Sequence, residues 1–181
     1  KGKLQEIKLS RQYKDDEWFD IVTPEGKAVG KAPRSLCHGD PNLLHPVVHV
    51  HVFNSNGELW LQQRATNKSI QPGKWDTSVG GHVMHKETID QALQREVQEE
   101  LGIERLAHEP LFRYVMRNNI ESELIYTFRG IHNGPFSYPE SEIKDGRFWT
   151  IQEIIDNLGK QVFTPNFEQE FELMRKTKHI R

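Results

Sequence analysis

The sequence predicts an α/β fold, an α/β/α sandwich in which helices cover both faces of a mixed β-sheet. Three observations lead to this prediction. Apolar residues alternate along strand-like segments, one amphipathic helix follows them, and further strands and helices complete the chain. Because hairpins are combined with strand–helix units, we expect a mixed sheet between helix layers.

The N-terminal segment predicts a small strand pair at about 17–31. Two β-rich runs there flank the turn signal Pro24-Glu25-Gly26. A short helix at 33–37 is expected to follow it.

The segment 47–54 predicts a strand with one strongly apolar face. Its valines, Val48, Val50 and Val52, alternate with His49 and His51. The histidine face either borders a cleft or contacts solvent, and we expect the solvated position. The run Asn-Ser-Asn-Gly at 54–57 predicts a hairpin turn into a strand at 58–63, and a short extended run is expected at 75–79.

The clearest helix is predicted at 88–101. Thr88 and Gln91 form a capping-box pattern, and Gly102 stands where the helix should end. Its expected core side is an apolar row at every fourth position: Ile89, Leu93, Val97 and Leu101. The expected elements beyond it are strands at 111–115, 124–129 and 147–149 and helices at 151–157 and 166–176.

Length and charge limit the classes of function. The chain has 181 residues, and 24 Lys and Arg against 26 Asp and Glu give a formal net charge of −2 at pH 7. We expect a single domain, 1–181. No apolar stretch approaches the roughly 18 residues of a spanning helix, so no membrane partner is expected. The charge balance argues against general nucleic-acid binding.

The single cysteine, Cys37, rules out an internal disulfide framework and favours a reducing compartment. The sequence contains no apolar segment typical of a secretion signal. We therefore expect a cytoplasmic location.

Three acidic residues of the predicted helix are candidate metal ligands. Glu96, Glu99 and Glu100 fall within about one turn, where like charges cost roughly 0.2–0.5 kcal/mol per pair unless something neutralises them. Clustered carboxylates suit Mg²⁺, which prefers hard oxygen ligands together with substrate phosphates. Taken alone, the three glutamates are better explained by a solvated acidic face.

The spacing around these glutamates is more specific. Gly81, then Glu87 after five residues, then Arg95-Glu96-Val97-Gln98-Glu99-Glu100-Leu101-Gly102-Ile103 after seven more, resembles the signature of the Nudix hydrolase family, at 81–103. The resemblance implies a metal-dependent enzyme that binds Mg²⁺ or Mn²⁺. Its implied substrate is a diphosphate linked to another moiety, such as a nucleoside diphosphate derivative or a similar small molecule.

The resemblance also implies roles for single residues. Glu96, Glu99 and Glu100 match the metal-binding acids, and the Gly81 carbonyl is a possible further ligand. Glu87 and Arg95 match the pair that orients the loop and the helix. We call the segment 81–103 the Nudix box. The general base that takes a proton from water is expected to be either a glutamate of this box or Glu142 on a later loop. Alternatively, Glu142 is an ordinary loop residue.

Residues about 18–166 resemble the type I isopentenyl-diphosphate isomerases, a branch of the same fold. Those enzymes bind a metal through three histidines and two glutamates, which match His38, His45, His82, Glu121 and Glu123. This His/Glu set is expected either to hold Zn²⁺ or Mn²⁺, or to be inherited scaffolding satisfied by hydrogen bonds.

The isomerase resemblance extends to three basic residues. Arg64 and Lys68 match diphosphate-binding positions, and Arg34 stands where those enzymes usually have a lysine. Guanidinium and ammonium groups suit a diphosphate on electrostatic grounds. The alternative for Arg64 and Lys68 is a pair of solvated charges at a strand end.

Three departures from the isomerases favour hydrolysis. Gly80 replaces the proton-transferring cysteine, Asn166 replaces a tryptophan that stabilises a carbocation, and Glu96 replaces an arginine. Glycine moves no proton, and asparagine has no π-face for a cation. We therefore expect a Nudix-type diphosphohydrolase. The alternatives are an isomerase-like enzyme acting on an isoprenoid diphosphate and a catalytically silent, ligand-sensing domain.

Overall fold

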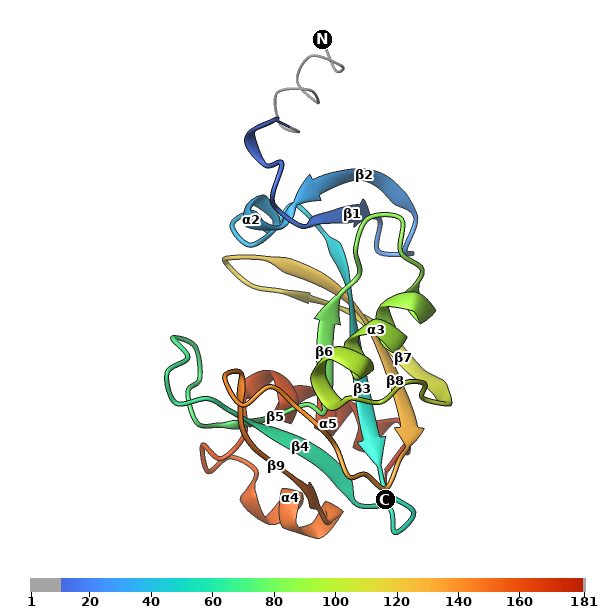
Figure 1. The fold of residues 1–181 in the computed structure, drawn as a ribbon, viewed down its shortest axis with the longest axis vertical. Helices are drawn as coiled ribbons and strands as arrows, with labels where there is room; N and C mark the ends of the chain where they lie inside the picture. Colours follow the sequence, from blue (N-terminus) through green and yellow to red (C-terminus); the bar gives the residue numbers. More distant parts are fainter. Residues whose placement is uncertain (1–10, 181) are drawn as a thin grey trace. The chain divides into compact units, whose positions relative to one another are not determined.

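The computed structural model describes residues 11–180 and has a mixed α/β fold, as predicted. Figure 1 traces its elements in chain order. The strands are β1 (Trp18–Val22), β2 (Ala28–Pro33), β3 (His45–Phe53), β4 (Leu59–Arg64), β5 (Trp75–Asp76), β6 (Val79–His82), β7 (His108–Arg117), β8 (Ser122–Ile131) and β9 (Ile143–Trp149). The helices are α2 (Arg34–Cys37), α3 (Ile89–Leu101), α4 (Ile151–Asn157) and α5 (Pro165–Lys176).

The strands form a two-stranded and a seven-stranded sheet. β1 and β2 make the antiparallel pair expected near the N-terminus. The larger sheet has the order β5-β4-β3-β8-β7, with β6 on β3 and β9 on β4. The predicted hairpin at 54–57 is confirmed, since Phe53 pairs with Leu59 in antiparallel register.

The chain divides into two compact units. The first comprises the described residues up to Val47 together with His82–Thr88 and Tyr114–Ile125. The second comprises Val48–Gly81, Ile89–Arg113 and the described residues from Tyr126 onward. Each unit has its own buried apolar residues.

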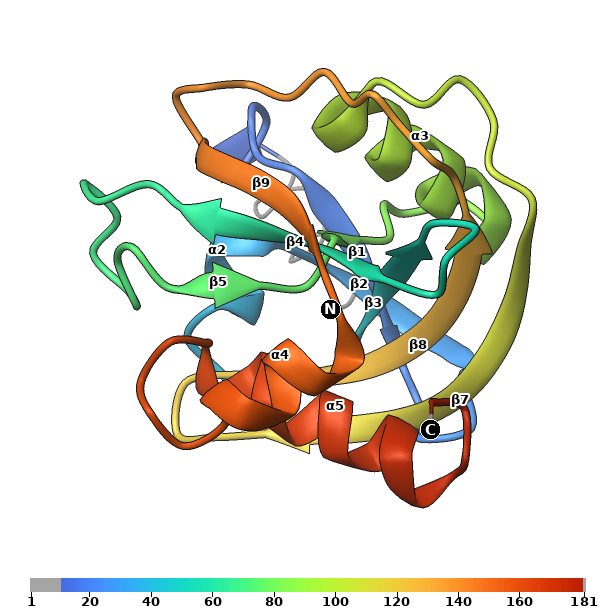
Figure 2. The same cartoon turned by 90° about the horizontal axis from the view of Figure 1, so that it is seen from below.

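The second unit contains the helix layers that the sequence predicted. Figure 2 shows α3 on one side of strands β4 and β9, and α4 and α5 on the other. Alternation along the strands accounts for this arrangement, because successive side chains point to opposite faces. In β4, Trp60 packs with the apolar row of α3, whereas its neighbours Leu59 and Leu61 pack with the phenylalanines of α5.

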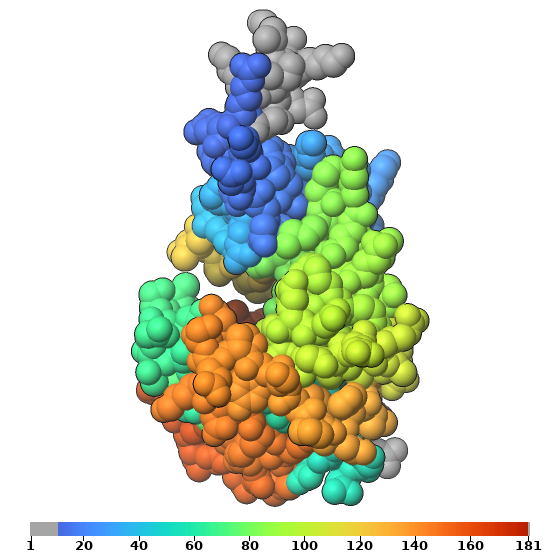
Figure 3. Space-filling view, viewed as in Figure 1, coloured from blue at the N-terminus to red at the C-terminus, as the bar shows by residue number. Residues whose placement is uncertain are grey.

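The C-terminal end of α3 lies where the sequence predicted it. Gly102 has φ +70°, a left-handed conformation that glycine adopts at little cost, and its N–H donates to the Gln98 carbonyl at 2.9 Å. The Ser137 N–H donates to the Leu101 carbonyl at 3.0 Å, which attaches the segment before β9 to the helix end. Figure 3 shows this segment, in orange, beside the yellow-green surface of α3.

The two C-terminal helices also match their predicted ranges. α4 begins and ends as expected, and α5 begins one residue earlier, at Pro165. Thr164 explains this start, because its hydroxyl accepts the Phe167 N–H at 3.2 Å and proline is well tolerated at the first helical position.

The first unit packs around Phe19, which is fully buried with Ala32 and Cys37. β1 also reaches the loop before α3, because Phe19 pairs with Met84 and the His85 N–H donates to the Trp18 carbonyl at 2.7 Å. Within residues 11–180, no helix is long and apolar enough to cross a membrane.

Candidate functional site

The side chain of Glu96 lies directly against the backbone of Gly81. A Cβ atom at position 81 would come within 2.1 Å of the Glu96 carboxyl carbon, so a side chain there would displace this carboxylate. The first glycine of the box and the first of its three candidate metal-binding glutamates are therefore neighbours in space, fifteen residues apart in the chain.

Arg95 neutralises part of the acidic charge on α3. One of its guanidinium nitrogens donates to Glu96 at 2.6 Å and to Glu99 at 3.3 Å. This pairing offsets the repulsion expected among the glutamates. The Glu99 side chain is 59% exposed, so it is the most solvated of the three.

Glu100 is held beside Gly80. One carboxylate oxygen accepts the Gly80 N–H at 3.2 Å, and the other accepts from the Gln62 amide at 3.3 Å. Burial, and then the charge of Glu96, raise the pKa of Glu100 to about 8. The carboxyl group therefore retains a proton near neutral pH, which a divalent cation beside it would displace.

Glu87 helps to shape the loop that leads into the box helix. One of its carboxylate oxygens accepts the Met84 N–H at 3.0 Å, and its own N–H donates to the Met84 carbonyl at 3.0 Å. Glu87 thus closes a turn in the segment 84–87, and its expected orienting role stays a prediction.

Two of the expected substrate-binding residues are paired with acids. Lys68 forms an ion pair with Glu142, the candidate general base. Arg64 donates from Nε to the Ile70 carbonyl at 3.0 Å and lies 3.7 Å from the Asp76 carboxylate. Lys68 and Glu142 are therefore direct neighbours, and their expected roles in diphosphate binding and proton transfer stay predictions.

Arg34 belongs to the first unit, where it pairs with Glu17 at 2.7 Å. Both side chains are exposed. Its expected role in diphosphate binding stays a prediction.

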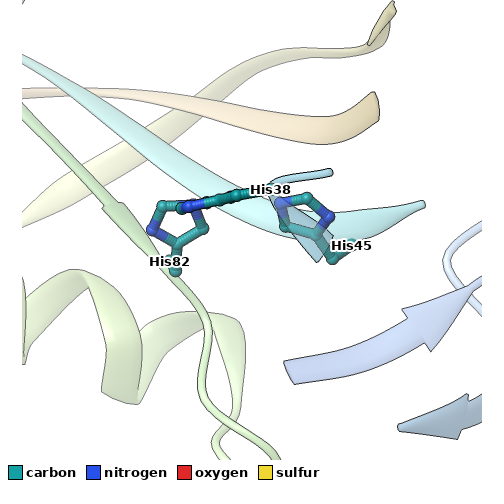
Figure 4. Close-up of side chains that lie close together, drawn as sticks. All are labelled: His38, His45 and His82. Carbon is teal, nitrogen blue, oxygen red and sulfur yellow. The ribbon is translucent and has the colours of Figure 1, made fainter. Parts of the chain in front are cut away.

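The His/Glu set is assembled within the first unit. Figure 4 shows the rings of His38, His45 and His82 close together. The Nε2 atoms of His38 and His82 are 3.1 Å apart, and all three histidines offer a nitrogen within 4.8 Å of the others. Glu121 lies 3.5 Å from His38 and Glu123 lies 3.6 Å from His82.

His45 decides whether this set suits a cation. Its Nδ1–H donates to the Leu43 carbonyl at 2.9 Å, while its buried Nε2 has no hydrogen-bond partner among the described residues. Burial lowers the pKa of His45 and that of His38, which favours neutral imidazoles. A neutral ring with an orphaned Nε2 lone pair is the form in which histidine binds a metal.

Glu121 and Glu123 complete a second group of candidate ligands with His45, whose atoms all lie within 4.8 Å of one another. Among residues 11–180, the side chains that converge this closely come from the His/Glu set and not from the box glutamates. The set therefore has the ligand types and the spacing to hold a cation.

The shared hydrogen-bond partner of His49 and His51 is not predicted by the sequence pattern. Both lie on β3, and Glu170 of α5 accepts from His49 Nδ1 at 2.8 Å and from His51 Nε2 at 2.6 Å. The expected solvated position is wrong for His51, whose side chain is 0% exposed, and His49 is only 18% exposed. The physical reason is that α5 covers the face of β3 that carries both rings.

Comparison with known proteins identifies the family. The NUDIX domain model matches residues 43–169. The chain belongs to the Nudix family. This range contains the box at 81–103, which confirms the resemblance on which the site residues were chosen.

Similar Nudix proteins fall into two groups. An uncharacterized Nudix hydrolase of Listeria monocytogenes, lmo0368, is 31% identical over 154 residues, covering 84% of this chain and 90% of that protein. An isopentenyl-diphosphate Delta-isomerase of Streptomyces avermitilis is also 31% identical, over 82% of this chain and 79% of its own length. Both resemblances are confirmed, and identity alone does not separate the two activities.

A solved structure confirms the Nudix fold. DR0079 from Deinococcus radiodurans superposes with a TM-score of 0.71 at 25% identity, covering 89% of this chain and 99% of that one. The Nudix domain of Shewanella oneidensis NrtR, solved with ADP ribose, superposes with a TM-score of 0.56 at 16% identity, covering 72% of this chain and 86% of that one. The predicted α/β/α sandwich with a mixed sheet is therefore the fold of this Nudix protein.

Proposed function

We propose that this Nudix protein is a metal-dependent hydrolase that cleaves a diphosphate linkage in a nucleoside diphosphate derivative or a similar small molecule. The observation that carries the proposal is a pair of contacts at the glycine segment, Gly80-Gly81. Glu96 lies against Gly81, and Glu100 accepts the Gly80 N–H. An intact box whose acids meet this backbone supports a catalytic domain over a silent sensor.

The donor set suits a hard divalent cation. Glu96 and Glu100 are close enough for the charge of one to raise the pKa of the other, and Glu99 is on the same helix. Mg²⁺ or Mn²⁺ held by these three residues, with the Gly81 carbonyl as a further candidate, would relieve that repulsion. The bound cation supplies Lewis-acid stabilisation of charge on the phosphates.

The chain's own residues supply the other parts of the reaction. Arg95 holds Glu96 and Glu99 in place through its two hydrogen bonds. Arg64 and Lys68 supply positive charge for the diphosphate, and Arg34 is the third candidate for that role. A box glutamate or Glu142 takes the proton from water, and Lys68 lies beside Glu142 as its ion-pair partner.

An isomerase is the second candidate, because the His/Glu set is assembled and His45 has an orphaned nitrogen. The residues at positions 80 and 166, where the isomerases have a cysteine and a tryptophan, argue against it. Gly80 has no side chain to move a proton, and Asn166, the second residue of α5, offers no aromatic face to a carbocation.

A substrate panel tests the proposal. Nucleotide sugars, dinucleoside polyphosphates, nucleoside di- and triphosphates and isopentenyl diphosphate are incubated with Mg²⁺ and with Mn²⁺, and products are identified by mass. We expect hydrolysis that falls by orders of magnitude in Glu100→Gln, because that change removes a box carboxylate. Glu104→Gln, at an exposed position just beyond α3, is the matched control and should retain full activity.

One outcome would contradict the hydrolase, and another would contradict only the role given to Glu100. Isomerised isopentenyl diphosphate without hydrolysis would favour the second candidate and show that a group other than a residue-80 side chain transfers the proton. Hydrolysis that persists at the native rate in Glu100→Gln would remove Glu100 from the mechanism.

A further inference from the structure

The side-chain amide of Gln62 lies among three hydrogen-bond acceptors of the second unit. Its nitrogen donates to the backbone carbonyls of Thr77 and Ser78 at 3.2 and 3.1 Å, and to a Glu100 carboxylate oxygen at 3.3 Å. A backbone carbonyl can only accept, so the two carbonyls determine which side of the amide faces them. Gln62 therefore presents a donor, and not an acceptor, to Glu100.

The two carbonyls belong to a backbone segment that is held from another direction as well. Ser78 is fully buried, and its hydroxyl oxygen accepts the Val52 N–H at 3.0 Å and donates to the Trp60 carbonyl. These contacts attach the segment to β3 and to β4. The amide of Gln62 is thus bonded to a backbone whose position is set by two strands of the sheet.

The two oxygens of Glu100 accept from different parts of the fold. Gln62 of β4 donates to one oxygen, and the Gly80 N–H of β6 donates to the other at 3.2 Å. A carboxylate oxygen has two lone pairs, so it can accept a hydrogen bond and bind a cation at the same time. Donors on both oxygens fix the rotation of the carboxylate as well as its position, whereas a single donor would let the group turn.

We propose that Gln62 is a positioning residue whose amide holds the Glu100 carboxylate in the orientation that binds the divalent cation. This role rests on the proposed function, which makes Glu100 a metal ligand. Hydrogen-bond partners of metal ligands orient those ligands, and their removal typically costs 10–100-fold in metal affinity, a range marked here as about one to two orders of magnitude. Gln62 lies outside the Nudix box, so the spacing at 81–103 does not indicate it.

The competing explanation is structural. The hydrogen bonds from Gln62 to Thr77 and Ser78 would by themselves join β4 to the segment before β6. A structural role predicts that substitution of Gln62 lowers the stability of the fold and leaves the cation affinity unchanged. A positioning role predicts a lower cation affinity, and this loss must depend on the Glu100 carboxylate.

Titration of chelator-treated protein with Mn²⁺ alone tests the proposal, with free Mn²⁺ measured by electron paramagnetic resonance. The proteins are the native chain, Gln62→Met, Glu100→Gln and the double variant. Methionine has nearly the length of glutamine and no donor. We expect Gln62→Met to weaken the Glu100-dependent Mn²⁺ binding by about 10–100-fold. The His/Glu set is intact in all four proteins, so its share of bound Mn²⁺ cancels in the comparison.

The double variant shows whether Gln62 acts through Glu100. Glu96 and Glu99 are still present in Glu100→Gln, and higher Mn²⁺ concentrations titrate the weaker site. There, Gln62→Met should cause no further loss, because the group that it positions is gone. An equal loss with and without the Glu100 carboxylate would overturn the proposal. Native Mn²⁺ affinity in a folded Gln62→Met protein, or in Glu100→Gln, would overturn it as well.

Gln63→Met is the matched control. Gln63 is the next residue of β4, and its amide also donates to a backbone carbonyl, that of Gly73, at 2.9 Å. Successive side chains of a strand point to opposite faces. We therefore expect native Mn²⁺ affinity in Gln63→Met, and urea denaturation verifies that both variants are folded. Equal losses of affinity in the two variants would contradict a specific role of Gln62.

Side-chain NMR of the ¹⁵N-labelled native protein gives a second measurement without any substitution. Addition of Mg²⁺ should shift the side-chain amide signals of Gln62, because the carboxylate that accepts its N–H then binds a cation. The signals of Gln63 should stay in place. Gln62 signals that saturating Mg²⁺ does not move would overturn the proposal.

These measurements use a cation and no substrate, so they distinguish the inference from the proposed function. If the substrate panel fails while Gln62→Met weakens Mn²⁺ binding through Glu100, the positioning role stands and the hydrolase does not. If hydrolysis is found and Gln62→Met binds Mn²⁺ as the native protein does, the hydrolase stands and this inference fails.

Discussion

At the scale of single residues, the raised pKa of Glu100 should make the stability of the protein depend on pH. Its folded pKa of about 8 lies above the ordinary value of 4.5, so the native state keeps a proton that the unfolded chain releases. Between these two pH values the unfolded state binds fewer protons, and stability must therefore fall as pH rises.

Glu100→Gln should remove this loss, because a neutral amide replaces the acid. In chelator-treated protein, the variant should gain stability over the native protein as pH rises from 5 to 8, by at most about 1.4 kcal/mol per pH unit. Urea denaturation at both pH values measures the difference. Glu104→Gln should keep the native pH dependence, and an unaltered slope in Glu100→Gln would show that the Glu100 carboxyl does not retain its proton in the native protein.

A larger residue at position 81 should disturb the box. In Gly81→Ala the new Cβ would lie 2.1 Å from the Glu96 carboxyl carbon, so that flexible side chain must move. We expect turnover with Mg²⁺ to fall by at least about tenfold, an order typical of a misplaced reacting group, with little change in thermal unfolding. Gly30→Ala serves as the control, and native turnover in Gly81→Ala would separate Glu96 from catalysis.

At the scale of elements, backbone contacts define where the helix α3 ends. Its C-terminal end is defined by Gly102, whose positive φ closes the helix and whose N–H bonds to Gln98. The same end receives the Ser137 N–H. Since the box glutamates occupy the last two turns, a correct end places them against the glycine segment.

Two glycine substitutions separate strain from crowding at this helix end. Gly57→Ala and Gly102→Ala both force alanine to positive φ, at +78° and +70°, which costs about 1–2 kcal/mol. Only at Gly102 does the new Cβ also meet Ser137, at 3.2 Å. Urea denaturation should therefore show a larger loss for Gly102→Ala. Equal losses would mean that the segment at Ser137 yields without cost.

At the scale of the whole molecule, the protein carries two sets of candidate metal ligands of different chemistry. The box offers carboxylates of the second unit, which suit Mg²⁺ or Mn²⁺. The His/Glu set of the first unit offers imidazole nitrogens and carboxylates, which suit Zn²⁺ or Mn²⁺. Each set is formed within one of the two units.

Removal of two histidines tests the second set. His38→Ala combined with His45→Ala should lower the content of Zn²⁺ or Mn²⁺ by about one ion per chain, because two imidazoles of the set are lost. Elemental analysis after dialysis measures it. His108→Ala, in the other unit, should keep the native content. Unchanged metal in the double variant would leave these histidines as scaffolding.

The sequence by itself determined the parts that depend on local periodicity and spacing. The apolar row of α3 and the glycine after it defined that helix to within one residue, because helix period and left-handed glycine are local properties. The spacing from Gly81 to Ile103 identified the family for the same reason, since its residues meet across one loop and one helix.

Only the tertiary structure decided contacts between residues distant in the chain. Glu170 lies more than a hundred residues from His49 and His51, and nothing in the alternation of β3 indicates that α5 covers its histidine face. The pairing of Lys68 with Glu142 was hidden in the same way. Such contacts depend on how helices pack against a sheet, and a strand pattern reveals which residues share a face but not what lies over it.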